Sequence, residues 1–276
     1  MAQQERAAVY AGTKNYYKFM IPAVKSLLMN SNVDKVYLLI EDKEFPYELP
    51  DCVQCIDVSN QRFFRQNGPN MNSRYTYMAL MKVTYAKLFP QYDRILSLDV
   101  DTIVVDDISE LWDLKLDGIP GTSTYYMAGV REPYKSRDGY LYINSGVLMF
   151  NLKALRETHM DQTLIDVLNE IRYTFPEQDA INKKCQGRML MIPEEYNFSM
   201  VSDETEEPKI FHYAVKKDWT MMPEYVKYEN TSWNDVMARR NVIRSNTKYE
   251  KRENGIDYYL GEDWKAKTSH LKQDSI

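Results

Sequence analysis

The first hundred residues alternate short apolar runs with segments of helical periodicity, and this alternation restricts the fold more than any other feature. Residues 36–40 are a continuous apolar run, which is typical of a strand that is buried on both faces. Comparable runs occupy residues 9–11, 53–58 and 94–105. Residues 16–30 and 76–89 instead place their apolar side chains on one helical face. Strands that alternate with helices predict an α/β fold with a mainly parallel central sheet flanked by helices.

The second half of the chain is less regular, but it extends the same architecture. It predicts strands near residues 121–127, 142–150 and 209–213, and helices over residues 158–172 and 177–185. No internal repeat or linker interrupts the pattern, so we expect a single domain over residues 1–223. Charge and polarity then rise, which predicts a polar C-terminal extension over residues 224–276. We expect this extension to lie outside the folded core, with a solvated helix as the alternative.

The composition supports a globular protein and argues against two classes of partner. Hydrophobic residues make up 44% of the chain and charged residues 27%, which is enough for a sizeable core. The net charge is −5 and no Lys/Arg-rich run stands out, so a nucleic-acid-binding surface is not expected. The sequence has neither an apolar signal core near its start nor a membrane-length apolar run, which predicts a cytoplasmic protein.

The three cysteines, Cys52, Cys55 and Cys185, favour the same location. An odd, low count argues against a disulfide framework and fits a reducing compartment. The spacing of Cys52 and Cys55 is that of half a zinc site, but no second pair follows. We therefore expect buried structural thiols.

An acidic pair, Asp99 and Asp101, lies at the end of an apolar run, where a strand would meet the edge of the sheet. Burial of Asp99 in such a strand would cost several kcal/mol unless the carboxylate is paired or binds a metal. Two carboxylates one residue apart can converge on one divalent cation, and hard oxygen ligands suit Mg²⁺ or Mn²⁺. A cation held there could bridge a diphosphate and neutralise its charge as it leaves.

Two other interpretations of the acidic pair remain open on the residues alone. A solvated turn rich in Asp is one, because Asp106 and Asp107 follow soon after. A phosphohydrolase that forms an aspartyl-phosphate is the other, since such enzymes also place an acidic pair after an apolar strand. Ile103 stands where those enzymes have Thr or Val, and no matching downstream Lys or paired Asp follows.

Four segments resemble motifs of the retaining glycosyltransferases of family 8, in the family's order and spacing. They are residues 89–112 around the acidic pair, 142–152 (YINSGVLMFNL), 176–182 (PEQDAIN) and 210–219, which begins IFHY. The resembling part of the chain covers roughly residues 7–220. The resemblance implies the GT-A, or Rossmann-like, α/β fold and transfer of a sugar with retention of configuration at the anomeric carbon.

The resemblance also implies the substrates and the metal. The donor would be a UDP-sugar carrying a hexose, glucose or galactose, and the cofactor Mn²⁺ or Mg²⁺. The acceptor would be a hydroxyl of a glycan, a lipid-linked glycan or a glycoprotein. The polar extension would then serve acceptor access or peripheral contact with the inner membrane face. A catalytically inactive binding protein of the same fold is the further alternative.

Roles in the family carry over to individual residues. The metal ligands would be Asp99, Asp101 and His212. The residues around the nucleotide, the diphosphate and the donor would be Ala11, Thr13, Asn15, Tyr16, Asp99, Val100, Asp101, Glu177, Lys216 and Lys217. The catalytic residues would be Lys82, Asn144, Gln178 and Asp179.

The chain departs from the family's pattern in four places. Thr13 stands where the family often has an acidic residue near the uracil. Lys82 stands where an Arg is common, which keeps the charge and loses the bidentate fork. Glu177 replaces an Asp and is one methylene longer. The segment after His212 lacks a Gly and a Pro that the family has near the diphosphate.

Overall fold

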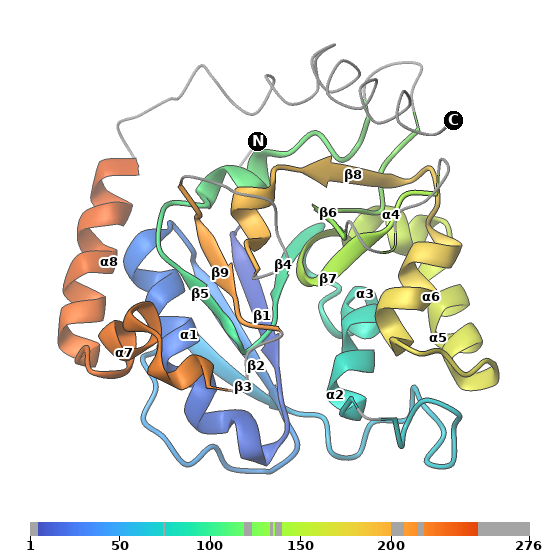
Figure 1. Cartoon of the computed structure of the whole chain (residues 1–276), viewed down its shortest axis with the longest axis horizontal. Coiled ribbons are helices and arrows are strands. Elements are labelled where there is room, and N and C mark those ends of the chain that lie inside the picture. Colours follow the sequence, from blue (N-terminus) through green and yellow to red (C-terminus); the bar gives the residue numbers. More distant parts are fainter. Residues whose placement is uncertain are drawn as a thin grey trace.

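A computed structural model describes residues 5–73, 75–118, 123–132, 135, 140–199, 207–214 and 218–247 of the chain (Figure 1). Its centre is a seven-stranded sheet of order β3-β2-β1-β4-β7-β6-β8. In chain order these strands are β1 (Ala7–Ala11), β2 (Lys35–Ile40), β3 (Val53–Asp57), β4 (Arg94–Leu98), β6 (Met127–Arg131), β7 (Ile143–Asn151) and β8 (Met189–Ile192). Pairs β3-β2, β2-β1, β1-β4 and β6-β8 are parallel, whereas β7 runs antiparallel to both of its neighbours. The predicted mainly parallel sheet is confirmed.

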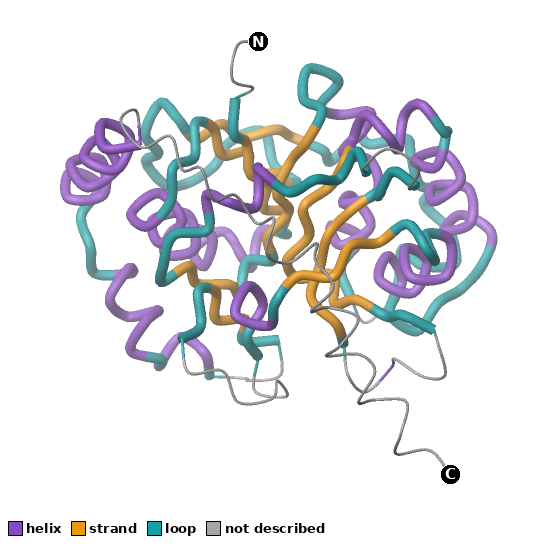
Figure 2. Tube along the Cα trace, turned by 90° about the horizontal axis from the view of Figure 1, so that it is seen from above, coloured by secondary structure: helices purple, strands orange, loops and turns teal. Residues whose placement is uncertain are grey.

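Helices cover both faces of this sheet, as Figures 1 and 2 show from two directions. On one side lie α1 (Tyr17–Asn30), α7 (Pro223–Glu229) and α8 (Trp233–Thr247). On the other lie α2 (Tyr77–Leu80), α3 (Tyr85–Leu88), α4 (Leu152–Glu157), α5 (Met160–Glu170) and α6 (Pro176–Lys184). Successive strand residues point to opposite faces. Tyr10 and Leu38 therefore join the core on one face, while Val9 and Leu39 join the core on the other. This double burial explains the continuous apolar runs.

One of the predicted helices is divided in the structure, and another is shorter than expected. The helix expected over 76–89 consists of α2 and α3 joined by a 3₁₀ turn, Met81–Thr84. The Thr84 hydroxyl donates a hydrogen bond of 2.7 Å to the Met81 carbonyl, and β-branched Val83 and Thr84 favour the helix weakly. The helix expected over 158–172 starts at α5, since His159 takes a left-handed conformation with φ of 57° between α4 and α5.

The predicted strands near the acidic pair also differ in extent. The strand expected over 94–105 ends as β4 at Leu98, and β5 (Thr102–Val104) pairs instead with β9 (Ile210–His212) in a two-stranded sheet. The chain turns between the two, with the Thr102 amide donating to the Asp99 carbonyl at 3.1 Å. The strand expected at 121–127 begins only at Met127, and residues 119–122 lie outside the described residues.

Helices α7 and α8 fall in the segment that we expected to lie outside the core, and that expectation is wrong for residues 224–247. Tyr225 and Tyr228 of α7 are buried, and Val236 of α8 joins the core beside α1. The Lys25 ammonium of α1 donates to the Thr231 carbonyl at 2.5 Å, just after α7 ends. The sequence obscured this packing because α8 presents few apolar side chains. No helix among the described residues has the length and apolar character needed to cross a bilayer.

Candidate active site

The candidate site lies beyond the carboxyl ends of β1 and β4, which are parallel neighbours at the centre of the sheet. From β1 the chain adds β2 and β3 on one side of β1, whereas from β4 it adds the remaining strands on the opposite side. Open α/β sheets bind ligands at such a switch point. A Cβ atom on Gly12, just after β1, would lie 3.4 Å from Cγ1 of Val100. The turn that follows β1 therefore adjoins the acidic pair that follows β4.

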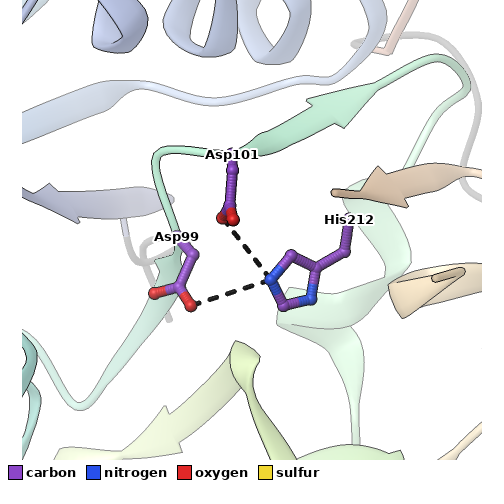
Figure 3. Close-up of side chains that lie close together, drawn as sticks. All are labelled: Asp99, Asp101 and His212. Atoms are coloured by element: carbon purple, nitrogen blue, oxygen red, sulfur yellow. Dashed lines mark ion pairs between the residues drawn. The ribbon is translucent and has the colours of Figure 1, made fainter. Parts of the chain in front are cut away.

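Asp99, Asp101 and His212 converge at this edge (Figure 3). The His212 Nε2 atom lies 3.4 Å from Asp101 Oδ1 and 3.8 Å from Asp99 Oδ2. Backbone pairing produces the arrangement, because Thr102 of β5 lies opposite His212 of β9 and the Tyr213 amide donates to the Asp101 carbonyl at 3.0 Å. On the other side, the Asp99 amide donates to the Gly146 carbonyl of β7 at 2.8 Å.

The charges in this cluster stabilise one another. Burial by itself would lower the pKa of His212, but the charge of Asp101 and the hydrogen bond to it outweigh burial and raise that pKa. Burial likewise opposes ionisation of Asp101, yet the adjacent His212 holds the pKa of the Asp101 carboxyl below its usual range. In the metal-free protein each of the two groups therefore stabilises the charged form of the other.

The three side chains fit a divalent cation of intermediate hardness. Each offers one ligand atom, and these atoms lie within 4.8 Å of one another. Two carboxylate oxygens and an imidazole nitrogen suit Mn²⁺, and carboxylates alone suit Mg²⁺. His212 is only 4% exposed, so the groups packed around its ring hold it in place.

Lys82 connects the acidic pair to helix α6. Its ammonium lies 2.6 Å from Asp99 Oδ1 and 3.7 Å from Glu177 Oε1, and it donates to the Ser145 carbonyl at 2.9 Å. Burial alone would lower the pKa of Lys82, but the charges of Asp99 and Glu177 outweigh burial and raise it. The buried cation thus offsets two carboxylates at the site.

The first turn of α6 carries three of the predicted residues. Glu177 Oε1 accepts from the Ser145 hydroxyl at 3.0 Å, and Gln178 Oε1 accepts from the Ser145 amide at 2.8 Å. Asp179 Oδ1 accepts from the Tyr142 hydroxyl at 2.5 Å. Burial tends to raise the pKa of Asp179, but the bond from Tyr142 and further donors outweigh it and lower that pKa. Hydrogen bonds to Ser145 of β7 and to Tyr142, which precedes β7, hold all three side chains in place.

Asn144 of β7 faces the same region. Its Nδ2 donates to Glu132 Oε2 at 3.0 Å, and its Oδ1 accepts from the Gly146 amide at 2.8 Å. Asn197 Nδ2 donates to the same Oδ1 at 3.0 Å. Sequence reasoning missed Asn197 and Ser145 as members of this network. Ser145 could have been found, because it stands beside Asn144 in the motif over 142–152.

The residues predicted to meet the nucleotide lie on the turn after β1. Ala11 ends that strand opposite Leu39, and the 3₁₀ helix Lys14–Tyr16 follows. Tyr16 is 40% exposed, and its ring packs edge-on against Phe19. An exposed ring at this position can stack on a base. Hydrogen bonds and ion pairs link eight of the other predicted residues, directly or through Tyr142, Ser145 and Asn197: Lys82, Asp99, Asp101, Asn144, Glu177, Gln178, Asp179 and His212. Lys216 and Lys217 lie outside the described residues.

Comparison with known proteins agrees with this architecture. The model of the family described as glycosyl transferase family 8 matches residues 7–222. The lipopolysaccharide 1,2-glucosyltransferase of Escherichia coli K12 is 30% identical over 57% of this chain and 56% of its own length. Glycosyltransferase GlyE of Streptococcus pneumoniae is 27% identical over 74% of this chain and 50% of its own. The chain thus spans about half the length of these two relatives.

Solved structures show the same fold. The galactosyltransferase LgtC, in complex with donor and acceptor sugar analogs, superposes with a TM-score of 0.63 at 18% identity, covering 84% of this chain and 99% of LgtC. The crystal structure of GlyE superposes with a TM-score of 0.63 at 21% identity, covering 91% of this chain and 66% of GlyE. The central sheet, its helices and the site at the switch point together form a GT-A fold.

Proposed function

Because the chain belongs to glycosyl transferase family 8, and is therefore a glycosyltransferase, we propose that it is a metal-dependent enzyme that transfers a hexose from a UDP-sugar with retention of configuration. The observation that carries the proposal is the convergence of Asp99, Asp101 and His212 within 4.8 Å at the sheet edge. These three residues would hold Mn²⁺ or Mg²⁺. When bound, the cation supplies electrostatic stabilisation of the diphosphate.

The rest of the nucleotide would extend from the acidic pair toward the end of β1. Tyr16 would stack on uracil, since this residue is 40% exposed. Ala11, Thr13, Asn15 and Val100 would line the path between base and diphosphate; Gly12 already brings that turn against Val100. Lys216 and Lys217 would add positive charge beside the diphosphate.

The donor sugar would lie between β7 and α6. Asn144 would orient the sugar near its reacting carbon, and Glu177 and Asp179 would accept from its hydroxyls. Gln178 would face that carbon from the side opposite the leaving group. An amide is a poor nucleophile, so we favour attack of the acceptor hydroxyl from the leaving-group face over a covalent intermediate. Lys82 would hold Asp99 and Glu177 in place as charge develops on the diphosphate.

The sugar and the acceptor are proposed from the relatives. A similar protein is named a glucosyltransferase and a structural neighbour a galactosyltransferase, so we propose glucose or galactose. The acceptor would be a hydroxyl of a glycan, a lipid-linked glycan or a glycoprotein. We propose a cytoplasmic enzyme with peripheral contact at the inner membrane face, which is the location that would give access to a lipid-linked acceptor.

Thermal unfolding with UDP and UDP-sugars, with Mn²⁺ or with a chelator, tests the proposal. Ligand at about 100 times its dissociation constant stabilises a fold by about 2.7 kcal/mol. Asp101→Asn should abolish the Mn²⁺-dependent stabilisation, whereas Asp106→Asn should retain it, because Asp106 is exposed and outside the cluster. Equal stabilisation by UDP in chelator would contradict the metal site.

Turnover separates the proposal from its alternatives. An active transferase should hydrolyse its UDP-sugar slowly in Mn²⁺ without an acceptor, with release of UDP. Binding of the nucleotide sugar without any release of UDP would indicate an inactive binding protein. Turnover of a phosphate ester, without response to any nucleotide sugar, would indicate the phosphohydrolase instead.

A further inference from the structure

A chain of side-chain hydrogen bonds joins the candidate metal ligand His212 to Asn144. The connecting residue is Asn197, whose Oδ1 lies 2.7 Å from His212 Nδ1 and whose Nδ2 lies 3.0 Å from Asn144 Oδ1. Asn197 is 4% exposed and His212 also 4%, so solvent does not compete for the bond between these two side chains. Asn197 ends the 3₁₀ helix Glu194–Asn197. The next residue, Phe198, accepts from the His212 amide at 2.8 Å, which holds the two segments together.

The direction of each hydrogen bond follows from groups that cannot change roles. The Gly146 backbone amide can only donate, so the Asn144 atom that it meets at 2.8 Å must be the oxygen. On the other side of the Asn144 side-chain amide, Nδ2 lies 3.0 Å from Glu132 Oε2, and a carboxylate oxygen accepts hydrogen bonds. Two independent partners thus fix the orientation of the Asn144 side chain.

That orientation determines the next two positions in the chain. Since Asn144 presents its oxygen, Asn197 must present its NH₂ group there and its oxygen to His212. An oxygen beside a ring nitrogen requires that the nitrogen carry the proton. His212 Nδ1 is therefore protonated, and Nε2 is the nitrogen that faces Asp101 at 3.4 Å and Asp99 at 3.8 Å.

We propose that Asn197 is a positioning residue of the metal site, which keeps the proton of His212 on Nδ1 and reserves Nε2 for the cation. The proposal rests on the proposed function for the presence of the cation, but not for the state of the ring. Metal-bound histidines commonly donate their second N–H to an oxygen, and loss of that oxygen lowers metal affinity about 10–100-fold. Asn197 also ties the ligand to Asn144, so donor-sugar and metal contacts share one rigid support.

The ring nitrogen can be observed directly in protein labelled with ¹⁵N-histidine. The chain has three histidines, so the His212 signals are assigned by their loss in His212→Ala. We expect a protonated, slowly exchanging Nδ1 in the wild type, both metal-free and with diamagnetic Mg²⁺. Asn197→Leu keeps the side-chain shape and removes the acceptor, so it should abolish the slowly exchanging Nδ1–H. Asn197→Asp should restore it, because a carboxylate accepts from Nδ1–H.

Asn70→Leu is the matched control for loss of a buried asparagine. Asn70 is 1% exposed, and its hydrogen bonds among the described residues go to backbone groups at Leu168, Ile171 and Tyr173. It should lose stability without any change in the His212 signals. Mn²⁺ binding, followed by EPR of the free ion, should weaken about 10–100-fold in Asn197→Leu and stay near wild type in Asn70→Leu.

The outcomes distinguish the role of Asn197 from the proposed metal dependence. An unprotonated Nδ1 in the wild type, or a slowly exchanging Nδ1–H that persists in Asn197→Leu, would overturn the role of Asn197. Failure of the wild type to bind Mn²⁺, with the expected Nδ1–H signal and its loss in Asn197→Leu, would overturn the proposed metal dependence and support Asn197 as the group that fixes the ring.

Discussion

Gly146 lies directly against the ring of His212, because a Cβ atom on Gly146 would sit 2.1 Å from His212 Cε1 and 2.6 Å from Nδ1. No side chain fits there while the imidazole keeps its place. Gly146 is thus required by the close approach of β7 to β9, and not by a special backbone conformation. The glycine of the motif over 142–152 and the histidine of the motif over 210–219 are parts of one packing arrangement.

Gly146→Ala should therefore displace His212 from the acidic pair. We expect a loss of Mn²⁺ affinity of at least about 10-fold and destabilisation of about 1–3 kcal/mol from overpacking. Mn²⁺ titration and urea unfolding measure the two effects. Gly129→Ala is the control, because its Cβ would lie 2.7 Å from Leu148 Cδ2, in the core. It should destabilise the fold and spare Mn²⁺ affinity; equal loss of affinity in both variants would argue for a general effect of stability.

His212→Ala should weaken Mn²⁺ binding and alter its pH dependence. Protons compete with the metal for Nε2, and the pKa of His212 in the metal-free protein is raised above its ordinary 6.5. Mn²⁺ affinity of the wild type should therefore fall as pH decreases through a range that begins above 6.5. The variant should lack this part of the profile. Isothermal titration with Mn²⁺ across pH measures it.

His159→Asn is the matched control for that experiment. His159 has a φ of 57°, and Asn tolerates the left-handed conformation, so the backbone is preserved. His159 lies between α4 and α5, outside the cluster of potential ligands. A profile of His212→Ala that follows the wild type, or a His159→Asn variant that shows the same defect, would remove His212 from the set of ligands.

Lys82→Met should leave Asp99 and Glu177 without their common cation. Removing one partner of a buried ion pair costs about 3–5 kcal/mol, and Asp99 is one-third exposed, so we expect roughly 2–3 kcal/mol of lost stability. Lys82→Arg keeps the charge and should recover most of the stability. Urea unfolding and kcat/KM for donor hydrolysis, compared between Lys82→Met and Lys82→Arg, distinguish the effect of the Lys82 charge from the effect of its side-chain shape. Activity in Lys82→Met equal to the wild type would show that the Lys82 ammonium group has only a structural role.

Glu110 should contribute stability that depends on pH. Burial alone would raise its pKa, but bonds from Lys209 and from the Tyr196 hydroxyl outweigh burial and lower it below the ordinary 4.5. A carboxyl with a depressed pKa stabilises the fold above the unfolded-state value and loses that contribution as pH falls through the folded-state value. Unfolding free energies of wild type and Glu110→Gln should thus differ most at neutral pH. Their difference should shrink below about pH 4.5, and a constant difference would contradict the assignment.

The sheet could be predicted because its central strands β1, β2 and β4 are buried on both faces and therefore appear as largely apolar runs. Residues 36–40 illustrate this, since β2 spans Lys35–Ile40. The position of Asp99 after a strand was predictable for the same reason, as β4 ends at Leu98. Helix α8 was not, because it buries Arg240, whose guanidinium donates to the Val33 carbonyl at 3.1 Å. Apolar periodicity does not register a helix that is held by buried charge.

The candidate site was predictable only in part, and its roles remain predictions. The resemblance pointed to Asp99, Asp101 and His212, and the structure brings these three together. Asn197 had no signal in the sequence, because it lies in a short 3₁₀ helix whose position depends on backbone pairing with β9. Pairing between distant segments is a property of the folded chain and leaves no local pattern.

The pairing of β5 with β9 also affects when the proposed metal site can first form during synthesis of the chain. The strand that carries Thr102 and the strand that carries His212 are separated along the chain by three strands of the central sheet, β6 to β8, and by three α-helices, α4 to α6. A ribosome that has released β1 to β8 has produced a nascent chain with the acidic pair but without its histidine. The cation site can therefore close only after β9 has emerged and docked, since contacts of long sequence separation form late. Binding of a cation by all three side chains would therefore require a chain in which β9 has already paired with β5.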